Sequence, residues 1–175
     1  MERVIITGYM GAGKTTVGKA LSKELGLPFY DLDRYIETRM HKSIPEIFTE
    51  KGEDGFRKIE HNMLHEVAEF EDVIISCGGG TPCFFDNMDY MNENGDTVYL
   101  EAPVDVIWKH IHMGKTIRPL LQGKEDKEAI NFITRQLKER ETFYLKSKHM
   151  VDVGVLDSYE KINDIVQRIR QMLNL

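Results

Sequence analysis

One stretch near the start of the chain reads Gly8-Tyr9-Met10-Gly11-Ala12-Gly13-Lys14-Thr15. It matches the pattern G-x-x-x-x-G-K-[ST] at every fixed position, and this pattern is typical of a loop that binds nucleotide phosphates. The context agrees, because the apolar run at 3–7 predicts a strand and residues 14–25 have a helical pattern. Glycines let successive backbone N–H groups point at a phosphate beside the positive end of the following helix. A glycine-rich turn with an exposed lysine is the alternative, but it would not require this spacing.

The residues of this P-loop have separate expected roles. Lys14, which we expect to be exposed in the empty loop, would reach the β- and γ-phosphates of ATP, and the Thr15 hydroxyl would bind Mg²⁺. The residues of this segment that we expect to bind ATP are Gly11, Ala12, Gly13, Lys14, Thr15 and Thr16.

The P-loop does not by itself identify the reaction. The sequence contains no N-K-x-D, the motif with which a GTPase would bind guanine. An ATPase motor normally has an apolar strand that ends in Asp-Glu, whereas the apolar run at 73–76 is followed by Cys77 and three glycines. A small-molecule kinase is the class that remains.

Length and composition exclude several other classes. The chain has 175 residues, 41% of them hydrophobic and 30% charged, which predicts one globular domain over 1–175. A net charge of -6 without a long basic run argues against binding duplex nucleic acid. The apolar run at 4–6 is too short for a signal peptide or a membrane span. Cys77 and Cys83 are too few for a disulfide framework, so we expect reduced, unreactive thiols in a cytoplasmic protein.

Helical and strand patterns alternate along the chain, which predicts an α/β fold with a largely parallel sheet. The expected strands lie at 3–7, 29–31, 73–76, 97–101 and 150–153. Residues 34–70 interrupt the alternation with helical patterns alone, including a capping box at Ser43 and a longer helix after Gly52. Such an insertion could cover a ligand site or be purely structural. Residues 113–125 form a polar, glycine-bearing stretch that is typical of an active-site lid.

Two carboxylates follow the second expected strand, at the end of a parallel sheet where ligands bind. Either Asp31 or Asp33 could hold Mg²⁺ through water, while the other could accept a hydrogen bond from the attacking hydroxyl. Alternatively, Asp33 could cap the helix that begins at Arg34. The residues alone leave both interpretations open, and capping would not exclude a functional role.

Three arginines are candidates for binding anions. Arg140 lies on the apolar stripe of its helix, so it requires either an anionic ligand or a structural ion pair. Arg57 opposes the dipole at the start of its helix, which indicates another interaction, either with a ligand or with Glu60. Arg118 precedes Pro119 in the expected lid, where an arginine can contact the transferred phosphate; a solvated loop arginine is the alternative.

Three consecutive glycines, Gly78, Gly79 and Gly80, directly follow the apolar run at 73–76. Glycines at the end of a strand make room for another group to approach the backbone closely. A plain tight turn would rarely need all three, so we expect a ligand or another side chain to lie against this segment.

Taken in order, these motifs resemble those of shikimate kinases. The matching segments are Gly8-Tyr-Met-Gly-Ala-Gly-Lys-Thr15, Asp31-Leu-Asp33, Gly52-Glu-x-x-Phe56-Arg57-x-x-Glu60, Gly78-Gly79-Gly80, Arg118-Pro-Leu-Leu and Arg140-x-x-x-Tyr144. The resemblance covers nearly the whole chain. It implies a P-loop kinase fold like that of nucleoside monophosphate kinases, with a five-stranded parallel sheet flanked by helices. Residues 29–31 would form an edge strand, about 34–60 a substrate-binding flap, and about 113–125 the lid.

The resemblance also implies roles for single residues. Lys14, Asp33 and Arg118 would be catalytic, and Arg118 would close from the lid onto ATP. Thr15 and, through water, Asp31 would hold Mg²⁺. Asp33 would bind the ring hydroxyls of shikimate, including the one that is phosphorylated. The residues expected to bind shikimate are Asp33, Arg57, Gly79, Gly80 and Arg140, with both arginines on its carboxylate.

The resemblance has gaps at the adenine site. Members of this family often carry an adenine-contacting basic residue seven positions before the lid arginine, but Ile111 stands there, between His110 and His112. Nothing in 154–157 can be assigned to adenine either.

A P-loop of this kind is compatible with three alternative functions: a kinase for another polyol acid such as gluconate, a nucleoside monophosphate kinase, and a regulatory module that binds ATP without turnover. The Asp31/Asp33 pair with the triple glycine favours shikimate over gluconate, and the Phe56-Arg57 flap with the triple glycine is not the signature of a nucleoside monophosphate kinase. The intact set Lys14, Thr15, Asp33 and Arg118 argues against lost catalysis. We expect shikimate and ATP as partners, no nucleic acid or membrane partner, and a monomer.

Overall fold

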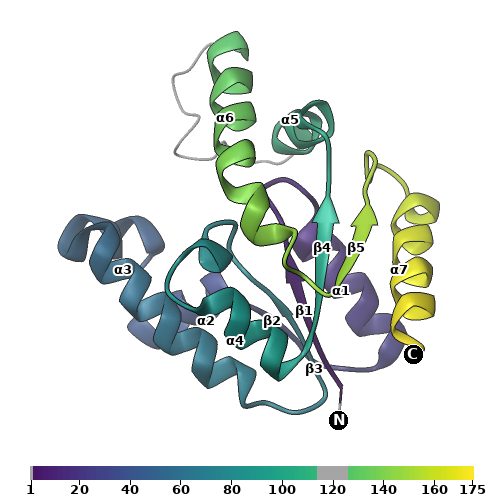
Figure 1. Ribbon diagram of the computed structural model, residues 1–175, viewed down its shortest axis with the longest axis horizontal. Coiled ribbons are helices and arrows are strands. Elements are labelled where there is room, and N and C mark those ends of the chain that lie inside the picture. Colours follow the sequence, from purple (N-terminus) through teal and green to yellow (C-terminus); the bar gives the residue numbers. More distant parts are fainter. Residues whose placement is uncertain (1, 114–125) are drawn as a thin grey trace.

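The computed structural model describes residues 2–113 and 126–175, which form a sheet flanked by helices (Figure 1). The strands are β1 (Arg3–Thr7), β2 (Phe29–Asp31), β3 (Val73–Ser76), β4 (Asp96–Glu101) and β5 (His149–Asp152). The helices are α1 (Lys14–Leu25), α2 (Leu32–Met40), α3 (Ile44–Ala68), α4 (Asn87–Asn94), α5 (Val104–Met113), α6 (Asp126–Tyr144) and α7 (Tyr159–Leu173), with a 3₁₀ turn η1 (Thr81–Cys83). All expected strands are present, and the bounds of β4 and β5 differ from expectation by one residue.

The strands form one parallel sheet in the order β2-β3-β1-β4-β5. The predicted five-stranded parallel sheet is therefore confirmed, with β2 at one edge. From the central β1, the chain first builds one side of the sheet through β2 and β3, then the other through β4 and β5. A crevice for a ligand is expected at the carboxyl end of β1, where the direction of winding changes.

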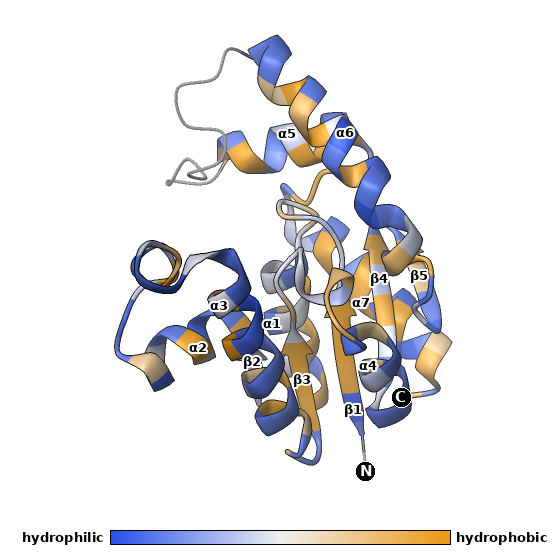
Figure 2. Ribbon diagram, turned by 60° about the vertical axis from the view of Figure 1, so that its left-hand side comes forward, coloured by the Kyte–Doolittle hydropathy of each residue, from blue (hydrophilic) through white to orange (hydrophobic). Residues whose placement is uncertain are grey.

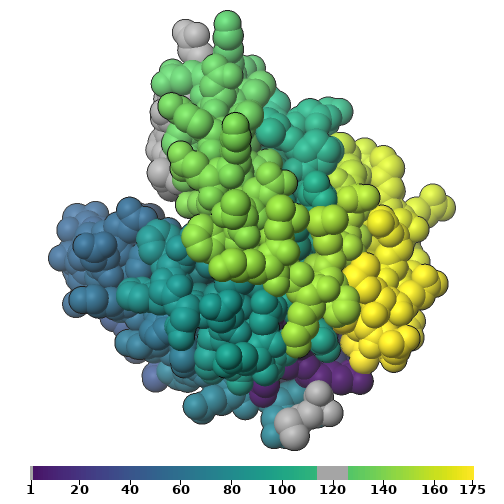
Figure 3. All heavy atoms as spheres, viewed as in Figure 1, coloured from purple at the N-terminus to yellow at the C-terminus, as the bar shows by residue number. Residues whose placement is uncertain are grey.

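Apolar residues of the strands alternate between two cores, because successive side chains of a strand point to opposite faces. Val4 and Ile6 of β1 pack in one core with Val17 of α1. Ile5, between them, packs in the other core with Leu64 of α3. Figure 2 shows the result: the strands are coloured as hydrophobic and the helices carry hydrophilic residues on their outer surfaces. The sheet is almost hidden in the space-filling view beneath α4, α6 and their neighbours (Figure 3).

Helix α3 projects away from the sheet and has a bend (Figure 1). Its start has the predicted capping box, in which Ser43 Oγ accepts from the backbone N–H of Glu46 and the Glu46 carboxylate accepts from the N–H of Ser43. The bend is at Gly52, whose φ of 69° and ψ of 179° are not helical. The two helices expected on either side of Gly52 are therefore two arms of one bent element.

Helices α5 and α6 stand at the carboxyl end of the sheet (Figure 1). The segment between them, residues 114–125, lies outside the described residues, and with it Arg118 and all of the expected lid except Met113. Within the described ranges, the helices are too short or too polar to cross a bilayer.

Candidate active site

The P-loop turns the chain from β1 into α1 through glycines with unusual backbone angles. Gly8, Gly11 and Gly13 have φ of 146°, 80° and 101°, values that side chains strongly disfavour. A Cβ at Gly8 would also lie 2.9 Å from the carbonyl oxygen of Leu100. Gly13 occupies the N-cap of α1 and no side chain caps this helix end. Its first N–H groups are thereby left for an anion, as a phosphate-binding loop requires.

Lys14 is not exposed, contrary to expectation. Its side chain is buried, and its ammonium donates to the carbonyl oxygens of Gly8 at 2.6 Å and Tyr9 at 2.9 Å. The physical reason is that an ammonium out of water needs acceptors, and the loop's own carbonyls supply them. A phosphate entering the loop would therefore compete with these carbonyls for Lys14.

Asp31 connects the P-loop with α2. Its Oδ2 accepts a hydrogen bond of 3.2 Å from the Thr15 hydroxyl, and its Oδ1 accepts from the N–H of Arg34 at 3.2 Å, which caps α2. The alternative in which Asp33 is the cap is therefore wrong, because Asp33 already lies in the first turn of the helix. Thr15 Oγ1 and Asp31 Oδ2 therefore lie side by side, and oxygen is the ligand that Mg²⁺ prefers.

A cavity of about 350 Å³ lies at the carboxyl end of β1. Its lining residues are Met10, Gly11, Gly13, Lys14, Thr15, Thr16, Asp31, Asp33, Ser76, Cys77, Gly78, Gly79, His110, Met113 and Leu156. The structure thus brings together most of the predicted nucleotide residues with both predicted acids. Arg57 and Arg140 do not line this cavity and lie next to it.

Each glycine after β3 makes room for one of the residues expected to bind substrate. A Cβ at Gly78 would lie 3.0 Å from Asp33 Oδ1, and one at Gly79 would lie 3.2 Å from a guanidinium nitrogen of Arg140. A Cβ at Gly80 would lie 2.6 Å from a guanidinium nitrogen of Arg57. The close approach predicted for the triple glycine is confirmed. The approaching groups are one acid and two arginines from three different helices.

Arg57 is buried and belongs to a polar network within the protein. Its Nη1 donates to Glu60 Oε1 at 2.9 Å, and the hydroxyl of Thr81 donates to Glu60 Oε2 at 2.9 Å. The guanidinium lies 4.1 Å from the centre of the Phe84 ring. Its Nε is buried without a hydrogen-bond partner among the described residues. The intrahelical pair with Glu60 is therefore present, and further donors of the guanidinium remain for a ligand.

Arg140 is half-buried near the carboxyl end of α6, which ends at Tyr144. The described residues provide it with no carboxylate within ion-pair distance, so they do not contain the structural ion pair that was the alternative for this residue. Its guanidinium stands 5.8 Å from the centre of the Tyr9 ring. One turn later, the Tyr144 hydroxyl donates to the Gly79 carbonyl at 2.5 Å and ties α6 to the glycine segment. An anionic ligand beside Gly79 would supply the missing counter-charge.

His110 is a site residue that sequence reasoning did not assign. Its Nδ1 lies 2.6 Å from the carbonyl oxygen of Gly11, and its Nε2 accepts the N–H of Leu156 at 2.9 Å. These two bonds require a ring with its proton on Nδ1. His110 therefore joins the P-loop to the segment after β5. The only signal in the sequence was its place beside Ile111, where the family often has a basic residue.

The two cysteines are both free thiols, as predicted. Cys77 is buried beside Met91, and its burial raises the pKa of its thiol well above the usual range. It is therefore a packing residue at pH 7, although its backbone borders the cavity.

A P-loop that joins β1 to α1 in this sheet, with acids and arginines converging on its mouth, defines an ATP-dependent small-molecule kinase. The family model described as shikimate kinase matches residues 10–174. A curated shikimate kinase from Bacteroides thetaiotaomicron is 51% identical over 175 residues, which cover 100% of both chains. The chain belongs to the shikimate kinase family.

Solved structures agree with this assignment. A crystal structure of shikimate kinase from Bacteroides thetaiotaomicron matches with a TM-score of 0.95 and 50% identity, covering 99% of each chain. A shikimate kinase from Acinetobacter baumannii in complex with shikimate matches with a TM-score of 0.87 and 31% identity, covering 99% of this chain and 93% of the other. The resemblance read from the motifs, the fold class and the kinase activity are confirmed.

Proposed function

We propose that the protein transfers the γ-phosphate of ATP to a hydroxyl of shikimate, giving shikimate 3-phosphate and ADP. The observation that carries this proposal is the convergence on the glycine segment, where Asp33, Arg140 and Arg57 each face one glycine at 3.0, 3.2 and 2.6 Å from an ideal Cβ. Shikimate has ring hydroxyls and a carboxylate. One acid beside two guanidinium groups matches both features, because a guanidinium binds a carboxylate through paired hydrogen bonds.

In the proposed reaction, the substrate hydroxyl oxygen forms a bond to the γ-phosphorus. The bond between that phosphorus and the oxygen bridging to the β-phosphate breaks, and its electron pair leaves with ADP. Asp33 orients the hydroxyl and accepts its proton. Because the transition state of phosphoryl transfer is loose, orientation contributes more than early deprotonation. The Lys14 ammonium would leave the carbonyls of Gly8 and Tyr9 and bind the negatively charged phosphate oxygens.

Mg²⁺ fits the oxygens at the P-loop. Thr15 would bind the ion directly and Asp31 through water, and the hydrogen bond between them at 3.2 Å already places both at the cavity. The ion would neutralise charge on the β- and γ-phosphates. We further propose one domain over 1–175 that acts as a monomer, with a substrate flap at about 34–60, a lid at about 113–125, and Arg118 contacting the phosphates from the lid.

The proposal is tested by measuring ADP release with shikimate, gluconate and AMP at equal concentrations. We expect shikimate to give a kcat/KM at least about 100-fold above either competitor. AMP has no carboxylate for the two arginines, and the open chain of gluconate does not hold its carboxylate and hydroxyls in the fixed arrangement of the shikimate ring. Lys14→Ala, purified in parallel, reports contaminating kinases and should be inactive. Exposed Lys19 on the same helix gives the matched control, and Lys19→Ala should retain full activity. A preference for gluconate or AMP would overturn the proposal.

A further inference from the structure

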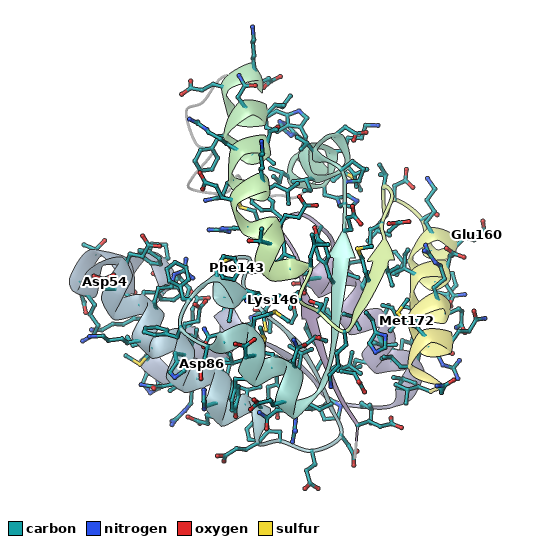
Figure 4. The ribbon with its side chains drawn as sticks, viewed as in Figure 1. Asp54, Asp86, Phe143, Lys146, Glu160 and Met172 are labelled. Carbon is teal, nitrogen blue, oxygen red and sulfur yellow. The ribbon has the colours of Figure 1, made fainter. Side chains whose placement is uncertain are left out.

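A second cluster of potential ligands lies between α3 and α4, away from the phosphate cavity. His61 and His65 are one helical turn apart on α3, and Asp86 is the N-cap of α4. One ring nitrogen from each histidine and one carboxylate oxygen of Asp86 lie within 4.8 Å of one another. Figure 4 labels Asp86, which lies beside α3 at the start of α4. We propose that these side chains form a binding site for a transition-metal ion of the zinc type.

The tautomer of His61 is set for metal binding by a neighbouring amide. Asn87 is buried, and its Nδ2 donates to the carbonyl oxygen of Thr81 at 2.9 Å, which fixes the orientation of the amide. Its Oδ1 then lies 2.6 Å from His61 Nδ1 and can only accept. The proton of His61 is therefore on Nδ1, and Nε2 keeps the lone pair that a metal requires. A metal-binding histidine is typically held by such a second hydrogen bond.

The other two members have unused ligand atoms. His65 Nε2 is buried without a hydrogen-bond partner among the described residues, which is unusual for a polar atom. Asp86 stands at a helix N-cap, yet its side chain makes no capping hydrogen bond. The residue before it, Phe85, is exposed with a φ of 51°, a strained conformation for a bulky side chain.

The ligand set indicates the kind of ion. Two imidazoles and one carboxylate suit Zn²⁺, with water in the remaining position, and suit Mg²⁺ poorly. Zn–N bonds of about 2.0 Å place tetrahedral ligand atoms roughly 3.3 Å apart. The side chains must therefore close from within 4.8 Å, and the exposed Asp86 carboxylate is free to rotate. Stacking of His65 on the Tyr90 ring, at 3.6 Å between centroids, is the purely structural alternative.

A metal ion here would clamp α3 to α4. The clamp would lie at one end of a buried polar chain, in which Asn87 binds Thr81 and Thr81 binds Glu60. Glu60 in turn holds Arg57. Ligation would therefore also hold in place the network that positions this arginine.

The test is a titration of the metal-free protein with Zn²⁺ alone, in competition with a chromophoric chelator and without thiol reductants. We expect one Zn²⁺ per chain with a micromolar or tighter Kd, and at least about a 10-fold loss of affinity in Asp86→Asn and in His65→Gln. Asp86 is exposed and caps nothing, so Asp86→Asn keeps the fold. The thermal midpoint should rise with Zn²⁺ in the wild type and stay constant in Asp86→Asn.

Two control variants make the result specific. His149→Gln removes a ring whose Nε2 lies 3.9 Å from Asp96, outside the cluster, and should leave affinity unchanged. Cys83→Ser removes the half-buried free thiol and should also leave it unchanged. A wild type that binds no Zn²⁺ in the micromolar range would overturn the site, as would Asp86→Asn and His65→Gln variants with wild-type affinity.

Discussion

Arg57 donates a hydrogen bond of 2.9 Å from Nη1 to Oε1 of Glu60, and both side chains are buried. The second carboxylate oxygen of Glu60 accepts from the Thr81 hydroxyl at 2.9 Å, so each oxygen has a donor. The sequence left two possible partners for the Arg57 guanidinium, a bound ligand or the Glu60 carboxylate. They are compatible in the structure, because a guanidinium has five N–H donors and Glu60 occupies only part of them.

Two variants distinguish the contribution of the Arg57–Glu60 ion pair to stability from the contribution of Arg57 to substrate binding. Arg57→Met alone leaves the Glu60 carboxylate buried without its cation, and we expect the free energy of unfolding to fall by about 3–5 kcal/mol. Arg57→Met combined with Glu60→Gln removes both charges and should recover most of that loss. The KM for shikimate should nevertheless stay at least about 10-fold raised. Denaturant unfolding and steady-state kinetics measure the two effects, and a wild-type KM in the double variant would confine Arg57 to a structural role.

Arg140 tests the binding of the carboxylate more directly, because it is half-buried and has no acidic partner among the described residues. Arg140→Ala should raise the KM for shikimate by about one to two orders of magnitude, since a charge-assisted hydrogen bond contributes roughly 1.5–3 kcal/mol. The carboxylate takes no part in bond making, so kcat and the KM for ATP should change little. Exposed Arg135, on the same helix, gives the control Arg135→Ala. Equal KM values in both variants would refute the assignment.

Gly80→Ala should impair shikimate binding through a steric effect alone. The backbone at Gly80 has a φ of −90°, which alanine tolerates, but its Cβ would lie 2.6 Å from a guanidinium nitrogen of Arg57. Arg57 would have to move, and we expect a rise in the KM for shikimate of about 10-fold or more. Gly154→Ala is the control, because a Cβ there meets nothing within 4 Å. A Gly80→Ala variant with an unchanged KM would show that the position of Arg57 does not matter.

Asp33→Asn retains the shape of the side chain and loses its ability to take a proton. We expect kcat to fall by about 10²–10⁴-fold, the usual contribution of a positioned acid or base. Nucleotide affinity should be preserved, because the hydrogen bond from the Thr15 hydroxyl goes to Asp31. Asp54, exposed on α3 and labelled in Figure 4, provides the neutral control Asp54→Asn. A loss of ATP affinity with unchanged kcat would instead place Asp33 at the metal.

The contacts of His110 lead us to expect that this residue affects the binding of ATP. His110→Ala removes the bridge between Gly11 and Leu156, so both segments beside the cavity lose a fixed position. We expect the KM for ATP to rise by about 10-fold and the KM for shikimate to remain within about twofold. His112 lies two residues further on α5, and its contacts in the described residues are with the carbonyl and the ring of Trp108 on its own helix, so His112→Ala is the matched control. Identical ATP kinetics in the two variants would exclude a positioning role.

Local features of the fold were predictable because they depend on a few neighbouring residues. The P-loop requires glycine at positive φ, as Gly11 and Gly13 confirm, and the capping box at Ser43 closes within its own first turn. The edge position of β2 followed from the resemblance rather than from strand patterns. Asp31 and Asp33 were both identified as site residues, but the residue that caps α2 was misassigned between them. Aspartate is a favourable N-cap residue at either position, so the choice between them depends on where the helix starts. In the structure α2 starts at Leu32, which makes Asp31 the cap.

The sequence by itself determined the class of the protein, because the phosphate loop and the order of its motifs are local in the chain and tolerate little variation. The tertiary structure alone decided how the site is assembled. Lys14 is buried on carbonyls of its own loop, each of the glycines 78–80 faces a different helix, and His110 binds a carbonyl 99 residues away. Such contacts join segments that the sheet order brings together, and their distances depend on packing between layers. No local pattern of residues encodes them.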